Sequence, residues 1–364
     1  MTEASYIQVC VVNANRVDFD RAIDWSILSP AVKVFHDDLG VNPTDDDIIL
    51  RCAPNTEVLV TKEIAISAAC IMQLPLSVRM ICEAGTGYNN IDLQACRERD
   101  IQVRNVPSYS EAAVASLVIT FLLNLSCGMK QSQAELLEGN RDRFYRGLPY
   151  DTCFEVEGKV LGLIGGSGKI GSRVAAIAVA MNMRVIISSR SIPSVDGSSS
   201  NSDRIEYTTS IDYLLENSDY VSLHCPLNTE TKDIINAESL KKMKKSAYLI
   251  NTARGIIDIN TIIAYFTIHS CSFEFNICAL ILMLGGLVDE VALIDALEHN
   301  VIAGAGLDVQ VREPPFDKSP LYTLKNVILT PHIGWKRKET RQRLVHAVSM
   351  NIKSYLNGGN MNVV

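Results

Sequence analysis

The sequence predicts an α/β protein with two doubly wound, parallel-sheet domains. Short apolar runs alternate with helical stretches along nearly the whole chain, and this alternation is typical of parallel strands connected by helices. The chain has 364 residues, 47% of them apolar, which is enough for roughly two domains that each bury a core. A soluble globular protein is therefore expected, with ligands bound where the strands end.

The first third of the chain contains five apolar runs that we expect to be buried strands. They are residues 7–12, 33–35, 57–61, 78–83 and 101–106. Helices are expected between them at 45–52, 65–73 and 92–99. After Pro107, one long apolar helix is expected over roughly 110–138, followed by an irregular segment at 141–157.

A second alternating series begins near residue 160 and contains six expected strands. They are residues 160–164, 184–188, 220–224, 247–251, 302–308 and 327–330. Helical stretches, such as 169–181 and 236–243, lie between them. Six strands in sequence is the count of a dinucleotide-binding Rossmann domain. The Ser-rich segment 191–203 is expected to be a surface loop.

A glycine fingerprint lies between the first strand of this series and the helix after it. The run 166–171 reads Gly-Ser-Gly-Lys-Ile-Gly, with Gly165 as an extra residue before it. Such glycines permit a tight turn and close packing, and the helix N-terminus faces a pyrophosphate. The cofactor contacts expected here are Gly166, Gly168, Lys169, Ile170 and Gly171.

The end of the next strand indicates which dinucleotide binds. An NAD-binding domain has an acidic residue about 20 residues after the fingerprint, to bind the ribose 2′-hydroxyl. Here the chain has Ser189, Arg190 and Ser191 instead. Guanidinium pairs with phosphate through two hydrogen bonds, so NADP(H) is favoured and NAD(H) is possible. The alternative is that Arg190 is merely a solvated side chain.

Three polar segments follow later strands of the second series, at 251–255, 306–314 and 330–334. They contain Arg254, Glu313 and His332. With the fingerprint and the runs 85–92 and 224–227, they resemble the D-isomer-specific 2-hydroxyacid dehydrogenase family. The resemblance extends over nearly the whole chain. Among its subgroups, the glyoxylate/hydroxypyruvate reductases match best, through the Ser/Arg cofactor site.

The resemblance implies a hydride transfer between the cofactor and a small 2-keto or 2-hydroxy acid. Arg254 would hold the substrate carboxylate and polarise the keto oxygen. His332 would exchange the proton, because histidine titrates near neutral pH. Glu313 would hydrogen-bond the imidazole and favour its charged form. The alternatives are an Arg254 in a structural ion pair and a His332 that only ends a strand.

The resemblance also implies further contacts. Backbone groups near Gly85, Thr86 and Gly87 would bind the substrate carboxylate together with Arg254. The further cofactor contacts would be Cys225, Pro226, Thr252, Ala253, Asp308 and Gly334. His224 lies in an apolar strand and is expected to be structural. No metal is expected.

The resemblance divides the chain into two parts with an active-site cleft between them. Residues 1–105 and 335–364 would form a flavodoxin-like substrate domain, and 106–334 the NAD(P)-binding Rossmann domain. A homodimer is expected through the long helix and irregular segment near 107–157.

Charge and composition exclude some other classes. The net charge of −7 and the pI of about 5.5 argue against nucleic acid or an anionic membrane as partner. The ten cysteines show no paired spacing, and the first 15 residues show no signal peptide, so a reduced cytoplasmic location is expected.

Residues 256–285 have no counterpart in the family. Without them the chain would read Asn-Thr-Ala-Arg-Gly-Gly-Leu-Val-Asp-Glu, as the family does, and the segment lacks Lys, Arg and Pro. We hypothesise a translated retained intron or an error in the assigned exons. A lid, an oligomer contact or part of a membrane segment are the alternatives, although charged residues interrupt the apolar run.

Three functions are therefore compared. The first is an NADPH-dependent reductase of a short 2-keto acid such as hydroxypyruvate or glyoxylate. The second is a dinucleotide-sensing binding protein of the corepressor type, which can retain the catalytic residues. The third is a catalytically impaired isoform, because the insert begins two residues after Arg254.

Overall fold

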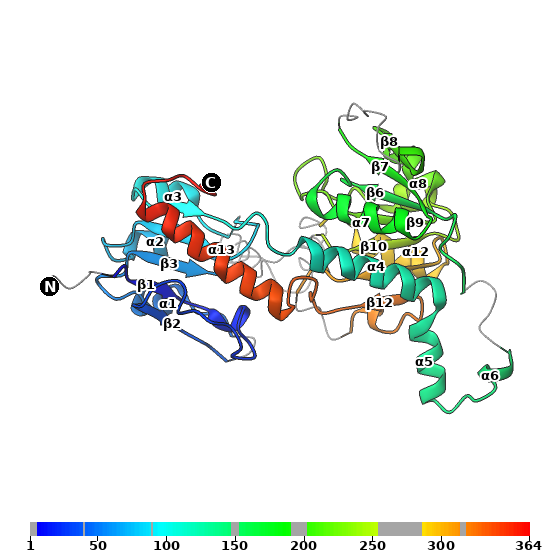
Figure 1. Ribbon diagram of the computed structural model, residues 1–364. Helices are drawn as coiled ribbons and strands as arrows, with labels where there is room; N and C mark the ends of the chain where they lie inside the picture. Colours follow the sequence, from blue (N-terminus) through cyan, green and yellow to red (C-terminus); the bar gives the residue numbers. More distant parts are fainter. Residues whose placement is uncertain are drawn as a thin grey trace, which may run out of the picture. The chain divides into compact units, whose positions relative to one another are not determined.

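A computed structural model describes residues 6–38, 41–88, 90–146, 153–190, 202–253, 286–313 and 318–364. The chain divides into two compact units. Unit 1 comprises Met1–Ser110 and Trp335–Val364, and unit 2 comprises Glu111–Gly334. Each unit is built around one parallel sheet (Figure 1). The predicted fold class, two doubly wound parallel α/β domains, is confirmed.

Unit 1 contains a five-stranded parallel sheet in the order β2-β1-β3-β4-β5. This order is that of a flavodoxin-like sheet. The strands are β1 (Val9–Val11), β2 (Val32–Val34), β3 (Val58–Thr61), β4 (Met80–Glu83) and β5 (Gln102–Arg104). β3 and β4 are buried along their whole length, as expected for strands covered on both faces.

Helices cover both faces of this sheet. The helices are α1 (Asp45–Arg51), α2 (Ala68–Gln73), α3 (Leu93–Glu98) and α13 (Lys338–Leu356), with a short 3₁₀ turn at Ala14–Arg16. α13, near the C-terminus of the chain, packs its apolar side against one face of the unit 1 sheet (Figure 1). α2 begins at residue 68, later than the expected 65, because Ser67 caps its N-terminus by accepting from the Cys70 N–H.

Unit 2 contains a seven-stranded parallel sheet in the order β12-β11-β10-β9-β6-β7-β8. The strands are β6 (Val160–Ile164), β7 (Arg184–Ser188), β8 (Ile205–Thr208), β9 (Tyr220–Leu223), β10 (Tyr248–Asn251), β11 (Gly304–Leu307) and β12 (Val327–Leu329). The expectation of six strands was wrong, because β8 was assigned to no element. The strand order reverses between β6 and β9, which is where doubly wound sheets bind ligands.

Helices of unit 2 lie on both faces of its sheet. They are α4 (Glu111–Cys127), α5 (Met129–Leu137), α6 (Arg143–Arg146), α7 (Lys169–Ala180), α8 (Ile211–Asn217), α9 (Ala237–Lys242) and α12 (Glu290–Glu298), with 3₁₀ turns at Ser202–Arg204 and Pro320–Tyr322. α4 and α7 pack together on one face, whereas α8, α9 and α12 cover the other.

The single long helix expected over 110–138 was wrong. Gly128, with a φ of 59°, ends α4 and starts α5, and the two helices are bent by 62°. A left-handed residue cannot continue an α-helix. α5 and α6 leave the body of unit 2 as a projecting arm (Figure 1). Within the described residues, no single helix is long and apolar enough to span a membrane. Only the bent pair α4 and α5 reaches the necessary length and apolar composition, and only when the two helices are taken together.

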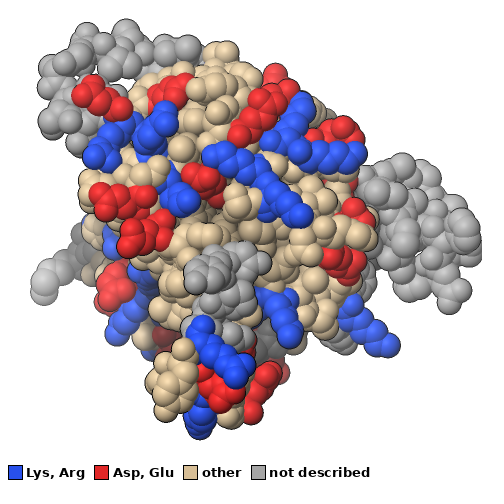
Figure 2. All heavy atoms as spheres, turned by 90° about the vertical axis from the view of Figure 1, so that its right-hand side faces the viewer, with Lys and Arg blue, Asp and Glu red and all other residues tan. Residues whose placement is uncertain are grey.

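Charged side chains of both signs lie interspersed on the face drawn in Figure 2. The face shows basic and acidic side chains next to one another rather than separated into two fields. Exposed ion pairs of the protein include Lys242 with Asp212 and Lys241 with Glu238. Exposed pairs of this kind contribute little to stability.

Candidate active site

The two side chains at the centre of the predicted catalytic site lie in direct contact. His332 Nδ1 is 2.7 Å from Glu313 Oε2, and the two side chains are 18% and 20% exposed. Glu313 Oε1 accepts a hydrogen bond of 3.1 Å from the Gln310 N–H. A carboxylate held at Nδ1 orients the ring and fixes which nitrogen carries the proton. The geometry is therefore suited to proton exchange at Nε2.

Asp308 holds the backbone that carries His332. His332 has a φ of 51°, an uncommon conformation for a residue other than glycine. Its N–H donates to the Asp308 carbonyl at 3.0 Å. The buried Asp308 carboxylate accepts from the Thr330 hydroxyl at 2.5 Å, the Ile333 N–H at 2.7 Å and the Gly334 N–H at 2.9 Å. These contacts hold the strained turn in place.

Sequence reasoning gave Asp308 and Gly334 only as cofactor contacts and missed their role in the turn at His332.

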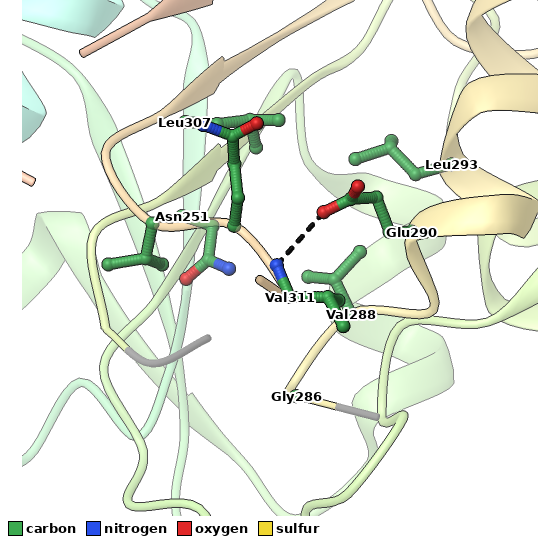
Figure 3. A pocket seen from close by; sticks show the side chains of 9 residues that line it. Asn251, Gly286, Val288, Glu290, Leu293, Leu307 and Val311 are labelled. Carbon is green, nitrogen blue, oxygen red and sulfur yellow. Dashed lines mark hydrogen bonds between the residues drawn. The ribbon is translucent and has the colours of Figure 1, made fainter. Parts of the chain in front are cut away.

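Sequence reasoning also missed Glu290, in the first turn of α12. Glu290 Oε2 accepts from the Val311 N–H at 2.9 Å, in a pocket also lined by Asn251 and Leu307 (Figure 3). Burial raises the pKa of Glu290, with a further contribution from the charge of Glu313. Glu290 thus holds the segment from which Glu313 projects.

The glycine turn between β6 and α7 is packed too tightly for side chains at most positions. Gly165 has a φ of 76°, and a Cβ there would lie 2.6 Å from the Cys225 nitrogen. A Cβ on Gly171 would lie 2.5 Å from the Gly166 Cα. A Cβ on Gly168 would meet only the Gly165 oxygen, at 3.6 Å. The side of the turn at Gly168, where α7 begins, is therefore open to the phosphates of a dinucleotide.

Buried polar atoms near the same sheet edge also fit a bound dinucleotide. Within the described part of the chain, Thr252 Oγ1 and His224 Nε2 are buried without a hydrogen-bond partner. Burial lowers the pKa of His224 to about 4, so the ring is neutral at pH 7 and cannot act as an acid. Cys225 and Ala253, beside them in sequence, are half-buried, and Pro226 is exposed. A ligand at this edge could satisfy both orphaned atoms.

The segment expected to select the dinucleotide follows β7. The Ser189 N–H donates to the Thr208 carbonyl at 3.1 Å and ties this segment to β8. The Arg190 side chain is 91% exposed, and its Nη1 lies 3.9 Å from Glu230 Oε2. That distance leaves the guanidinium available for an anionic ligand. Ser191 lies outside the described residues.

Unit 1 contains the loop predicted to bind the substrate carboxylate. The Gly85 carbonyl accepts from the Val106 N–H at 2.8 Å, and the Thr86 carbonyl accepts from Asn105 Nδ2 at 2.7 Å. Across the ranges that the structure describes, the N–H groups of Gly85, Thr86 and Gly87 donate to no other part of the chain. Successive N–H groups with no acceptor inside the described chain are available to bind an anion.

Arg254 and the segment 256–285 lie outside the described residues, so the assignment of Arg254 remains a prediction. The chain is described up to Ala253 and again from Gly286. Residues after the gap are held in unit 2, because the Gly286 carbonyl accepts from the Asp233 N–H at 2.9 Å. The predicted roles of the other site residues also remain predictions.

The fold and the arrangement of these residues define a class of protein, the dinucleotide-dependent oxidoreductases. The family model for the NAD-binding domain of D-isomer-specific 2-hydroxyacid dehydrogenases matches residues 119–268 and 284–334. The chain belongs to this family and is an oxidoreductase that uses a nicotinamide dinucleotide. The family model leaves only residues 269–283 unmatched and extends over 256–268, so the expectation that the whole segment 256–285 has no counterpart in the family was wrong in part.

Curated relatives and solved structures are similar over most of the chain. A putative 2-hydroxyacid dehydrogenase of Haemophilus influenzae is 34% identical, over 83% of this chain and 85% of its own length. A hydroxypyruvate reductase of Blautia hydrogenotrophica is 30% identical, over 88% of each chain. An acyclic imino acid reductase, solved with NADPH and D-Arg, has 27% identity and a TM-score of 0.73, covering 98% of this chain and 100% of its own.

Proposed function

We propose that the chain is an NADPH-preferring reductase of a short 2-keto acid such as hydroxypyruvate or glyoxylate. The observation that carries the proposal is the 2.7 Å contact between His332 and Glu313. This pair follows strands of the same parallel sheet as the glycine turn, and all of these strands end at the carboxyl edge of the sheet. A proton-exchanging pair and a dinucleotide turn at one sheet edge are what carbonyl reduction requires.

The bound dinucleotide would supply the hydride to the keto carbon. His332 would donate a proton to the resulting alkoxide, and Glu313 would keep the imidazole in the orientation needed for that transfer. Arg254 and the N–H groups of Gly85 and Gly87 would hold the substrate carboxylate. In the opposite direction, His332 would accept the proton of the hydroxy acid. Unit 1 would thus supply substrate binding, and unit 2 the cofactor site.

The preference for NADPH rests on the segment after β7. Arg190 is exposed there, its neighbours in sequence are serines, and its acidic neighbour in space, Glu230, lies as far as 3.9 Å away, so a 2′-phosphate would gain an ion pair with the guanidinium. The imino acid reductase described above was solved with NADPH, which indicates that the fold accommodates this cofactor. NAD(H) remains the alternative.

The proposal is tested by measuring NADPH and NADH oxidation with hydroxypyruvate, glyoxylate, pyruvate and phenylpyruvate. The full chain and a chain lacking 256–285 are compared. We expect turnover with a short keto acid, faster with NADPH than with NADH. His332→Ala should abolish turnover and leave NADPH binding within about twofold. Faster oxidation of NADH would contradict the cofactor preference.

The two forms of the chain separate the alternatives. Turnover only by the shortened chain would identify the full chain as an impaired isoform. Binding of NADPH by both forms without turnover of any keto acid would favour a dinucleotide-sensing binding protein. Sequencing the transcript and the genomic DNA across codons 255–286 tests the retained-intron hypothesis independently. A spliced transcript that lacks the segment would support the hypothesis, and genomic DNA without splice signals there would exclude it.

A homodimer through the region 107–157 is part of the proposal. The arm formed by α5 and α6 exposes large apolar side chains, which a partner subunit would bury. They are Met129, Leu137, Phe144 and Tyr145. Light scattering after gel filtration should give twice the chain mass of 40.0 kDa. Leu137→Asp and Phe144→Asp together should give a monomer.

A further inference from the structure

A buried charged cluster lies directly behind the Gly85 loop of unit 1. Lys62 follows β3 and is only 3% exposed, and Glu83, the last residue of β4, is 0% exposed. A Cβ placed on Gly85 would lie 3.0 Å from Lys62 Nζ and 3.0 Å from Glu83 Oε1. Both charges therefore lie close to Gly85, on the side where a side chain would project. Burial of a lysine is costly, so its position here calls for an explanation.

The position of Lys62 is fixed by contacts from several elements. Asn13 holds the Lys62 backbone, donating from Nδ2 to the carbonyl at 2.6 Å and accepting from the N–H at 3.0 Å. The ammonium donates to Glu63 and lies 4.4 Å from the centre of the Trp335 ring. Burial opposes the charge of Lys62, but Glu63, Tyr109 and Glu83 outweigh burial and raise the pKa. Lys62 is therefore charged at neutral pH.

Glu83 is held beside Lys62 by two donors. Its Oε1 accepts from the Glu63 N–H at 3.0 Å, and its Oε2 accepts from Asn90 Nδ2 at 2.9 Å. Glu63 has a φ of 56°, so this hydrogen bond holds a strained residue in place. Burial raises the pKa of Glu83 to about 7, although Lys62 and both donors act in the opposite direction. Its charge therefore changes within the physiological range.

The geometry points to Lys62 as a positioning and specificity residue, whose ammonium attracts the substrate carboxylate to the Gly85 loop against the opposing charge of Glu83. This inference rests on the proposed function, because it assumes that the N–H groups of the loop bind a carboxylate. A buried charge a few ångströms from such N–H groups, shielded from water, acts strongly on an anion bound by them. Lys62 and Glu83 thus add a charge-dependent contribution to the affinity of the loop for the carboxylate.

A purely structural role for the two side chains predicts a different outcome. If they only supported the loop, replacing either one would weaken anion binding. In the electrostatic role, loss of the Lys62 charge weakens binding and loss of the Glu83 charge strengthens it. The variants Lys62→Met and Glu83→Gln separate the two cases, because they remove opposite charges with little change in size. Lys33→Met, an exposed lysine of β2 in the same unit, is the matched control.

The experiment measures binding of oxamate, an unreactive 2-keto-acid analogue, to the full chain saturated with NADPH. Quenching of NADPH fluorescence gives the Kd near pH 6 and near pH 8. We expect Lys62→Met to raise the Kd about tenfold and Lys33→Met to leave it unchanged. The Kd of the parent should rise about fivefold from the lower to the higher pH, as Glu83 becomes charged. Glu83→Gln should bind more tightly than the parent near pH 8 and equally near pH 6.

Each result supports or overturns a specific statement. The ratio of the Glu83→Gln and parent Kd values at one pH cancels any contribution from His332, which both proteins share. Equal weakening by both substitutions, or no change with Lys62→Met, would overturn the electrostatic role. If Lys62→Met does not fold, the sign of the Glu83→Gln effect decides alone. A parent that binds NADPH but no oxamate would overturn the proposed function itself. The NADPH affinity of all variants should match that of the parent.

Discussion

His332 combines a proposed role in proton exchange with a strained backbone, and two carboxylates contact it or its turn in different ways. Glu313 contacts the imidazole at 2.7 Å, whereas the Asp308 carboxylate accepts from the Thr330 hydroxyl and from the N–H groups of Ile333 and Gly334. In the proposed function, Glu313 would act on the proton of the imidazole, and Asp308 on the position of His332. Substitution of each should give a separable effect.

Glu313→Gln should reduce kcat and leave the cofactor site intact. The amide has nearly the same shape but no charge, and it can present an N–H to Nδ1 where the carboxylate only accepts. The imidazole then loses its preferred proton arrangement. We expect kcat to fall about 100-fold, with the Kd for NADPH within about twofold of the parent. Steady-state kinetics and fluorescence titration measure the two values. An unchanged kcat would exclude Glu313 from proton exchange.

Asp308→Asn should reduce both stability and turnover. Three donors point at the Asp308 carboxylate, and an amide N–H would face at least one of them. A buried donor without an acceptor costs about 1–3 kcal/mol. Urea unfolding should therefore show a loss of this size, accompanied by a lower kcat because the turn at His332 relaxes. Asp295→Asn, at an exposed position on α12, is the control and should change neither value.

The difference between the predicted and the observed site has a physical reason. The pair Glu313 and His332 could be predicted because each residue has a chemical role that its motif reveals. Lys62 and Glu83 could not, because no local pattern indicates that side chains 21 positions apart meet behind a glycine loop. Asp308 was assigned to the cofactor, since its contacts with the turn at His332 exist only in the folded chain.

At the scale of elements, the predicted position of the turn between β6 and α7 is confirmed, and its role in binding the dinucleotide stays a prediction. Gly165 looked like an extra residue, and the structure explains why it must be glycine: its φ is 76° and Cys225 packs against it. Gly168 differs, because its backbone conformation is allowed for any residue and it faces open space. The two glycines should therefore respond differently to the same substitution.

Gly165→Ala should destabilise the protein, and Gly168→Ala should leave stability unchanged but weaken NADPH binding. At Gly165, a Cβ meets backbone at 2.6 Å in a left-handed conformation, which costs at least about 1–2 kcal/mol. At Gly168, the methyl group would occupy the space that the phosphates need, and we expect the Kd for NADPH to rise about tenfold. Urea unfolding and fluorescence titration measure both effects. Equal destabilisation by the two variants would contradict this account.

Two elements were predicted wrongly for reasons that lie outside the local pattern. β8 is a half-buried edge strand with the sequence Ile-Glu-Tyr-Thr, so it has no continuous apolar run. The position of β8 in the sheet is determined by its pairing with β7, and sequence periodicity does not reveal this pairing. The helix expected over 110–138 bends at Gly128, where apolar periodicity alone gives no signal for a change of direction.

At the scale of the whole molecule, the chain is two units with separate cores and different buried titratable groups. Glu83 lies in unit 1 and His224 in unit 2. The sequence contains two tryptophans, Trp25 and Trp335, and both belong to unit 1. Tryptophan fluorescence therefore reports unfolding of unit 1, while far-UV circular dichroism reports both units. This difference makes their stabilities measurable in one sample.

The two units should respond to pH in opposite directions. The pKa of Glu83 is raised from 4.5 to about 7, so the folded unit 1 keeps a proton that the unfolded chain has lost, and unit 1 loses stability as pH rises through this window. The pKa of His224 is lowered from 6.5 to about 4, so unit 2 gains stability as pH rises from about 4 to 6.5. Each effect amounts to about 3 kcal/mol at most.

Urea unfolding near pH 5 and near pH 6.5 tests this prediction. The midpoint measured by tryptophan fluorescence should fall with rising pH, while the midpoint of the other transition seen by circular dichroism should rise. Glu83→Gln should remove the first slope and His224→Gln the second, each without affecting the other unit. Transitions that coincide at both pH values, with one common slope, would contradict it. They would mean that the two units unfold as one cooperative body.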